Sequence, residues 1–141
     1  SWHKDFLANR MDEYDPRVGS RIAKGAAQSA ADYITLCLER QRIIGLATEI
    51  TAPFDAIIMP TVAIIPPTIE HVDNDDVYFT ANMMTLRNTS VGNFLDRCSI
   101  SMPCHKQGEA PVGFMLTGRH GDDHHLFRIS MTVEQLLKSI R

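Results

Sequence analysis

A cysteine and a histidine stand side by side at residues 104 and 105, in the stretch SMPCHKQGEAPVGFML. A thiol beside an imidazole base is the arrangement that cysteine nucleophiles use. Neighbouring residues of an extended segment point to opposite sides, so His105 is poorly placed to deprotonate Cys104. A distant histidine could serve instead, although no local signature marks one. We interpret Cys104 as a small apolar side chain at a strand end and expect no catalytic role for it.

The second reactive-looking group is the histidine-rich run that begins at His120. His120 and His124 are four residues apart, which is the spacing of two metal ligands on one helix face. Gly121 and the acidic pair after it lie between these histidines and indicate that a helix starts there. We therefore expect a polar turn followed by a first helical turn, and no metal site.

Signatures of several other protein classes are absent from the 141 residues. No serine stands in a G-x-S-x-G elbow, and neither a P-loop nor a dinucleotide fingerprint is present. The net charge of −3, without clustered Lys and Arg, excludes the footprint of a nucleic-acid-binding protein. No apolar run approaches the length of a membrane span. We expect neither nucleic acid nor a membrane as a partner.

The overall composition is that of a globular protein, with 44% hydrophobic and 22% charged residues. Its length suits one domain, and we treat residues 1–141 as a single segment. The odd count of three cysteines, Cys37, Cys98 and Cys104, gives no disulfide framework and fits a reducing compartment. The N-terminal residues lack a signal-peptide pattern, so we expect a cytoplasmic location.

Three helices are predicted in the first third of the chain. The first spans residues 3–11, and the second runs from Pro16 to about Gly25 with Asp15 as its N-cap. The third has Ser29 as its N-cap, with Asp32 in the position of a capping box, and it ends before Pro53. Its apolar residues recur with the helical period of 3.6.

Three strands and further helices are predicted in the remainder. The apolar run 54–61 indicates a strand that is buried on both faces, and residues 98–102 and 112–117 are shorter strands. Between them we predict a proline-rich loop at 62–68, an acidic turn at 71–78 and short helical pieces within 79–95. An amphipathic helix begins at Asp122 or Asp123. The class is therefore α/β or α+β.

Short segments with distinctive glycines, prolines and asparagines follow one another from residue 14 onwards. They are Tyr14-Asp15-Pro16-Arg17-Val18, Arg21-Ile22-x-x-Gly25, Ser29-Ala30-x-Asp32-Tyr33, Phe54 to Thr61, Leu86-Arg87-Asn88-Thr89 with Asn93, Ser99 to Cys104, Ala110 to Leu116, and Gly118-Arg119 to Asp123. In this order, the set resembles the second half of the amidase signature family.

The resemblance implies an amide-bond hydrolase with an α/β sandwich around a mixed sheet, of which this chain would be the C-terminal portion. The family uses a Ser nucleophile, a second Ser in a cis peptide and a Lys base, without a metal or organic cofactor. The Gly/Ser-rich segment that carries the nucleophile is absent here, and none of the four lysines, Lys4, Lys24, Lys106 and Lys138, has the catalytic context. No catalytic residue can be assigned, and we expect the chain alone to be inactive.

In relatives, loops after the strands contribute to the substrate channel. By that analogy, the turn at Pro60 and Thr61 and the segment with Arg87, Asn88 and Asn93 are the pocket candidates for a small-molecule amide. These asparagines could equally satisfy loop backbone groups, and Pro60 could simply end a strand.

Two or three very apolar strands cannot bury both faces under the few helices predicted. We expect the N-terminal half of an amidase, or a second copy of the chain, to cover the apolar face. Two alternatives remain at this point: a stand-alone binding or scaffold domain derived from an amidase, and an enzyme that uses Cys104 or the pair His120 and His124.

Overall fold

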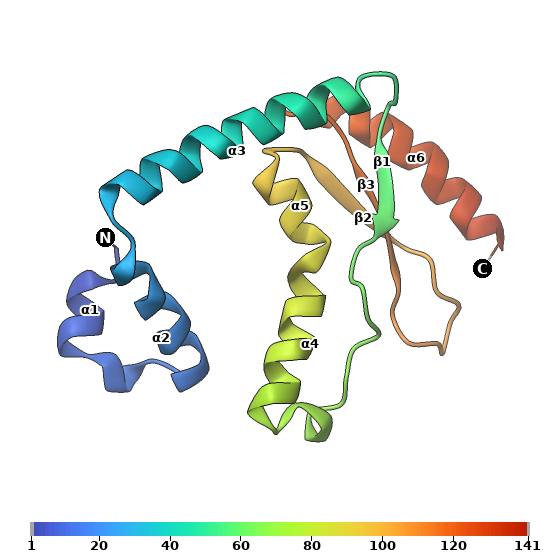
Figure 1. Cartoon of the computed structure of the whole chain (residues 1–141). Helices are drawn as coiled ribbons and strands as arrows, with labels where there is room; N and C mark the ends of the chain where they lie inside the picture. Colours follow the sequence, from blue (N-terminus) through green and yellow to red (C-terminus); the bar gives the residue numbers. More distant parts are fainter. Residues whose placement is uncertain (1, 141) are drawn as a thin grey trace. The chain divides into compact units, whose positions relative to one another are not determined.

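The structure is a computed structural model that describes residues 2–140. The chain divides into two compact units, residues 1–39 and 40–141, which are described in turn. The elements are labelled in Figure 1.

The first unit is helical. It contains α1 (Lys4–Asn9), α2 (Pro16–Ala23) and the beginning of α3 (Ala30–Thr51), with single 3-10 turns at Met11–Glu13 and Lys24–Ala27. The predicted N-cap of α2 is confirmed, since the Asp15 carboxylate accepts from the Arg17 backbone N–H at 2.8 Å.

The start of α3 is a reciprocal cap, as the sequence predicts. The Asp32 backbone N–H donates to Ser29 Oγ at 3.1 Å, and the Asp32 carboxylate accepts from the Ser29 backbone N–H at 3.0 Å. Ser29 Oγ also donates to this carboxylate at 2.7 Å. These hydrogen bonds satisfy donors that a helix leaves free at its first turn.

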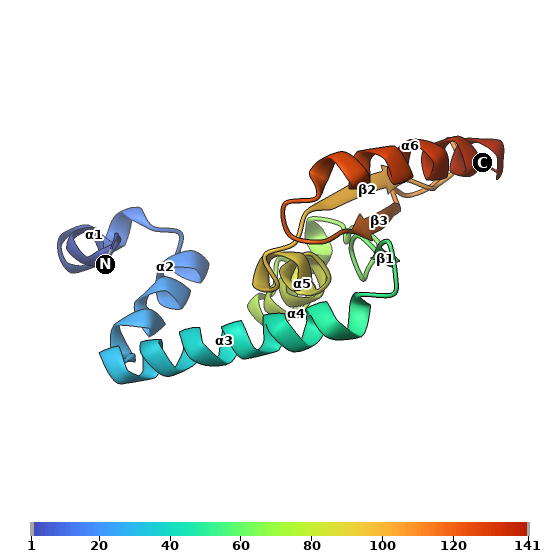
Figure 2. The same ribbon diagram turned by 90° about the horizontal axis from the view of Figure 1, so that it is seen from above.

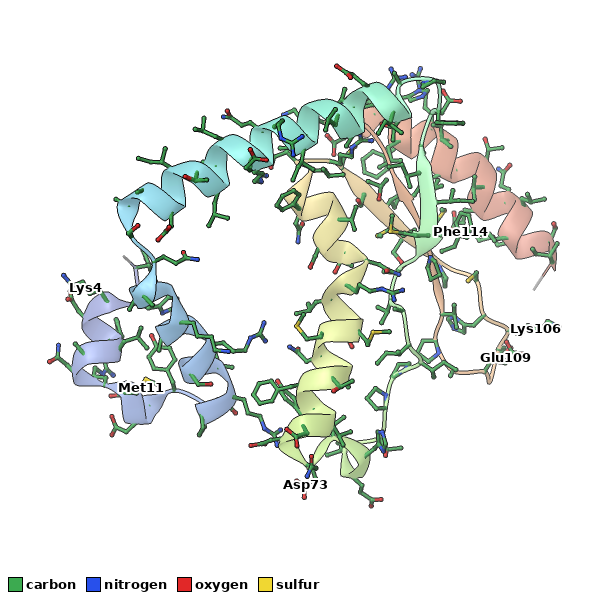
Figure 3. All side chains as sticks on the ribbon, in the orientation of Figure 1. Lys4, Met11, Asp73, Lys106, Glu109 and Phe114 are labelled. Carbon is green, nitrogen blue, oxygen red and sulfur yellow. The ribbon has the colours of Figure 1, made fainter. Side chains whose placement is uncertain are left out.

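The second unit is built on a three-stranded sheet. Its strands are β1 (Ile57–Pro60), β2 (Ser99–Pro103) and β3 (Gly113–Thr117), in the order β1-β3-β2 with both pairings antiparallel. The central strand β3 places Leu116 opposite Ile58 on one side and Ile100 on the other. Because β2 and β3 are paired directly, residues 104–112 form a long hairpin loop, whose tip carries Lys106 and Glu109 (Figure 3).

Helices lie on both faces of this sheet (Figure 2). One face is covered by α6 (Asp123–Ile140), and the other faces α4 (Asp75–Arg87) and α5 (Thr89–Phe94). A 3-10 turn at Glu70–Val72 precedes α4. The expected combination of helices with a sheet is confirmed, and the three strands described here are antiparallel, whereas the resemblance implied a mixed sheet.

The core of the second unit lies between α6 and the sheet. Its buried members come from β2, β3 and α6: Met102, Leu116, Leu126 and Leu137. On the opposite face the packing is close and partly polar, since Ser99 and the fully buried Thr117 share a hydrogen bond of 2.9 Å. A Cβ added to Gly92 of α5 would lie 2.8 Å from Ser99 Oγ, so α5 sits directly on this strand.

Two predictions of local structure are wrong. Strand β1 is not buried on both faces, because its burial alternates along the strand and Ile58, on the less covered face, is 63% exposed. The acidic stretch 71–78 is not a turn throughout: Asn74 caps α4, and its side chain accepts from the backbone N–H groups of Asp76 and Val77 at 3.0 and 3.3 Å. Acidic residues in a first helical turn are favoured by the helix dipole.

The described residues expose much apolar surface. Helix α3 buries no side chain, although large apolar residues lie on all its sides, a distribution typical of helices enclosed by protein. Within the second unit, Ile50 is 72% and Phe54 62% exposed. No helix among residues 2–140 is both long and apolar enough to cross a membrane.

Candidate binding groove

Four of the five predicted pocket residues gather where β1 ends. The buried Asn88, at the junction of α4 and α5, donates from Nδ2 to the backbone O of Pro60 at 2.7 Å. Its Oδ1 accepts from Arg87 Nε at 3.1 Å. Thr61 follows Pro60, and its backbone N–H donates to Gly113 O at 2.8 Å. The side chain of Asn88 therefore fixes the point where the chain leaves the sheet.

The fifth residue, Asn93, does not join this group. It lies in the last turn of α5 with its side chain exposed, and its backbone O accepts from Arg40 of α3 at 3.4 Å. The Arg40 guanidinium also pairs with Asp96. Asn93 thus belongs to the contact between α3 and the loop after α5.

An open groove of about 730 Å³ begins at Thr61. One wall is the chain after β1, the other is formed by the ends of β2 and β3 with the hairpin loop, and α4 contributes Thr85. The remaining lining residues are Val62, Ala63, Ile64, Ile65, Pro66, Pro67, Ser101, Pro103, His105, Pro111, Val112 and Gly113.

The polar centre of the groove is a pair of hydroxyl groups. Thr61 Oγ1 and Ser101 Oγ are 2.5 Å apart, although β3 lies between their strands. They meet above Gly113: a Cβ there would stand 2.5 Å from Thr61 Oγ1 and 2.6 Å from Ser101 Oγ. The absence of a side chain at Gly113 is therefore what allows the two hydroxyls to touch.

None of the residues that line the groove is Asp, Glu, Lys or Arg, and His105 is the one titratable side chain among them. A pair of hydroxyls that share one hydrogen bond retains one further O–H donor and several acceptor lone pairs. The groove can thus hold an apolar group along its walls and a neutral polar group beside Thr61 and Ser101.

Cys104 and His105 do not pair with each other in the structure. Both contact Val112 across the hairpin loop: the Cys104 backbone N–H donates to Val112 O at 2.9 Å, and the Val112 backbone N–H donates to His105 Nδ1 at 3.2 Å. The thiol lies 3.5 Å from Val112 O. These contacts close the hairpin loop on itself.

The histidines of the 120–125 run are dispersed. His120 lies before the helix and donates from Nδ1 to Asp96 O at 2.5 Å, whereas His124 lies within α6. Gly121, with a φ of +69°, turns the chain between them. Within residues 2–140, no three His, Cys, Asp or Glu side chains are grouped so that they could hold a metal ion.

A second cavity, of about 540 Å³, contains two arginines near the end of α3. Arg97 donates to Ala47 O at 3.1 Å and to Thr51 Oγ1 at 2.7 Å, and Arg119 donates to Ala52 O at 3.0 Å. These guanidinium groups thus donate to carbonyl groups in and just after the C-terminal turns of α3, where the helix dipole favours a positive charge. They act as a helix cap, and we do not assign a ligand to this cavity.

Sequence reasoning missed the partners of Thr61. Ser101 and Gly113 lie on two other strands, and nothing in their spacing places them opposite Thr61 before the strand order is known. The apolar wall is visible in the sequence as the loop 62–68, but apolar residues in a loop are not in themselves a signature of binding.

Comparisons with known proteins all point to one family, that of the amidases. A family model described as Amidase matches residues 1–127. Among curated proteins, 2-amino-5-chloromuconic acid deaminase of Comamonas testosteroni is 27% identical over 130 residues, which cover 92% of this chain and 28% of the relative. A glutamyl-tRNA(Gln) amidotransferase subunit of Sulfurisphaera tokodaii is 30% identical over 142 residues, which cover 97% of this chain and 29% of the relative.

Among solved structures, a glutamyl-tRNA(Gln) amidotransferase subunit of Thermotoga maritima matches with a TM-score of 0.56. It is 23% identical, and the match covers 86% of this chain and 27% of that one. This similarity confirms the fold. In each case the chain spans less than a third of the protein that it resembles.

Proposed function

Because this chain belongs to the amidase family, we propose that it forms part of an enzyme that hydrolyses amide C–N bonds. Its role is to complete the sheet and to supply one wall of the substrate pocket, at the groove that begins at Thr61. The observation that carries the proposal is the family match over residues 1–127, in a chain that spans 28–29% of its first curated relatives.

The catalytic groups come from elsewhere in this proposal. The 141 residues contain no Gly/Ser-rich segment of the kind that holds a serine nucleophile in the family. The four lysines, Lys4, Lys24, Lys106 and Lys138, are all exposed, and none lines the groove. We therefore expect the chain alone to hydrolyse no amide, and the substrate to meet its nucleophile on a surface that faces this groove.

The partner proposed for the apolar surface is the part of an amidase that carries the Gly/Ser-rich segment. Ile50, Phe54 and Ile58 are all more than half exposed in the second unit, and large apolar side chains left exposed in such number indicate a surface that a partner covers. A second copy of this chain is the competing occupant. No metal or organic cofactor is required by the proposal.

A chimera tests this function directly. The matched segment of the Sulfurisphaera tokodaii relative, 30% identical over 142 residues, is replaced by this chain, and ammonia release from a panel of primary amides is measured. We expect no release by this chain alone or by the relative with the segment deleted, and measurable release by the chimera. Robust hydrolysis by the purified chain alone, or a folded chimera without any hydrolysis, would contradict the proposal.

A further inference from the structure

We infer that the groove beside Thr61 and Ser101 binds a neutral carboxamide with an apolar chain or ring, and that it discriminates against amides that carry a charge. This inference rests on the proposed function, since it names the class of substrate for the same groove. It assigns the polar anchor to Thr61 and Ser101 and the apolar wall to residues 62–67.

The first argument concerns charge. A charged ligand group loses its hydration in a groove and needs an opposite charge or several donors in exchange. None of the lining residues is Asp, Glu, Lys or Arg, and Nδ1 of His105 is already used by the Val112 N–H. An α-amino group would therefore find no carboxylate here, and a carboxylate would find no Lys or Arg and only single O–H or N–H donors in exchange for its hydration.

The second argument concerns the hydroxyl pair. With one hydrogen bond shared between them, Thr61 and Ser101 still offer one O–H donor and free lone pairs. A carboxamide presents one acceptor oxygen and an N–H donor side by side, so both its polar groups can be satisfied at this pair. Gly113 keeps the pair assembled because a Cβ would overlap both hydroxyl oxygens.

The third argument concerns the walls. Beyond the hydroxyls, the chain after β1 presents Val62, Ala63, Ile64 and Ile65 followed by two prolines, and Val112 faces them from the hairpin loop. An aliphatic chain or a phenyl ring gains free energy by covering such surface, roughly 25 cal/mol per Å² of apolar area buried. The groove therefore selects an apolar acyl group.

The test uses the complete 141-residue chain and direct binding rather than hydrolysis. Hexanamide, hexanoate and L-glutamine are each titrated against the ¹⁵N-labelled chain, and amide chemical shifts are followed. We expect saturable shifts with hexanamide at groove residues, with a dissociation constant on the order of 1 mM for an amide of this size. Hexanoate and L-glutamine are expected to bind at least tenfold more weakly.

Matched variants locate the site. Ser101→Ala removes one hydroxyl and is expected to weaken hexanamide binding about fivefold, the effect of one hydrogen bond. Ser90→Ala, at an exposed position of α5 outside the groove, is its control and should leave binding unchanged. Ile65→Asp places a charge on the wall of the groove, and Ile69→Asp places the same charge just outside it. The native side chains of Ile65 and Ile69 are 63% and 89% exposed, so neither change disturbs the core.

Each outcome decides the inference. It is overturned if hexanamide gives no saturable shifts, if L-glutamine binds as tightly, or if Ile65→Asp and Ile69→Asp have equal effects. The proposed function fails separately. A chimera that hydrolyses amides but prefers L-glutamine defeats only this inference, and an inactive chimera beside Ser101-dependent hexanamide binding defeats only the proposed function.

Discussion

Asn88 holds Pro60 across a separation of 28 positions, since its side-chain amide donates to the Pro60 backbone O at 2.7 Å. The bond joins the junction of α4 and α5 to the end of the edge strand β1. Thr61, whose hydroxyl contacts Ser101, is the next residue along the chain. The position of the groove's polar centre therefore depends on a side chain that does not line the groove.

Replacing Asn88 by Ala should destabilise the second unit by about 1–2 kcal/mol, because the Pro60 carbonyl loses its donor. Urea unfolding followed by circular dichroism measures the change. Asn93→Ala is the matched control: its side chain is exposed and its contacts to Arg40 are made by the backbone O, so the effect should stay within about 0.5 kcal/mol. Equal losses in both variants would show that the bond from Asn88 contributes nothing specific.

Gly113→Ala should destabilise the sheet by about 1–3 kcal/mol through overpacking. The added Cβ would overlap the oxygens of Thr61 and Ser101, which lie 2.5 and 2.6 Å from its position. Gly45→Ala in α3 adds the same atom where no neighbour lies within 4 Å, and there we expect a gain of about 0.5–1 kcal/mol from helix propensity. Urea midpoints of both variants measure these changes. If Gly113→Ala left the stability unchanged, the two hydroxyl groups would have rotated away from the added Cβ.

Removal of the buried amide of Asn82 should leave stability unchanged or raise it. Its Nδ2 is buried without a hydrogen-bond partner among the described residues. Asn82→Ala gives up no hydrogen bond, and it removes a desolvated donor that costs about 1–3 kcal/mol when left unsatisfied. Asn93→Ala again serves as the control, because it reports the helix propensity gained at an exposed position. If Asn82→Ala were destabilising by about 2 kcal/mol or more relative to this control, the amide would have a partner within the chain.

The N-terminal cap of α3 should make the first unit sensitive to acid. The Ser29 side chain, and then its backbone N–H, hold the pKa of the Asp32 carboxyl below its ordinary value. Since the pKa is lower in the folded than in the unfolded chain, the stabilisation is fully present above about pH 3.9 and is lost as the pH falls through the folded pKa. Helicity measured from about pH 6 down to about pH 2 should fall in this window, and Asp32→Asn should remove the acid-dependent part.

Local features of the fold were accessible from the sequence, and distant ones were not. The caps at Asp15 and Ser29 were predicted correctly, because a cap and its helix lie within a few residues. The cap at Asn74 carried the same kind of signal, with two aspartates in the first helical turn, but the acidic composition favoured a turn. In this segment the cap residue, and not the acidic composition, decides the local structure.

The candidate site depends on pairs that are far apart in the chain. The pair Asn88 and Pro60 and the pair Thr61 and Ser101 are separated by 28 and 40 positions. The second pair requires the order β1-β3-β2, in which the last strand of the chain lies in the middle, and the first requires the junction of α4 and α5 to lie against the end of β1. Hydrophobic periodicity reports which face of a strand is buried and says nothing about its neighbours, so the residues at the end of β1 could be selected but their partners could not.

The exposed apolar surface should make the isolated chain self-associate. In the second unit, Ile50 and Phe54 are 72% and 62% exposed, and a partner that covers them would remove this surface from water. Sedimentation velocity of the chain alone should show concentration-dependent association, which Ile50→Lys combined with Phe54→Ser should reduce. Gln107→Lys, at an exposed position of the hairpin loop, adds the same single positive charge as Ile50→Lys and is the control for the change in charge. A stable monomer that unfolds cooperatively would instead favour a stand-alone domain over a portion of a larger amidase.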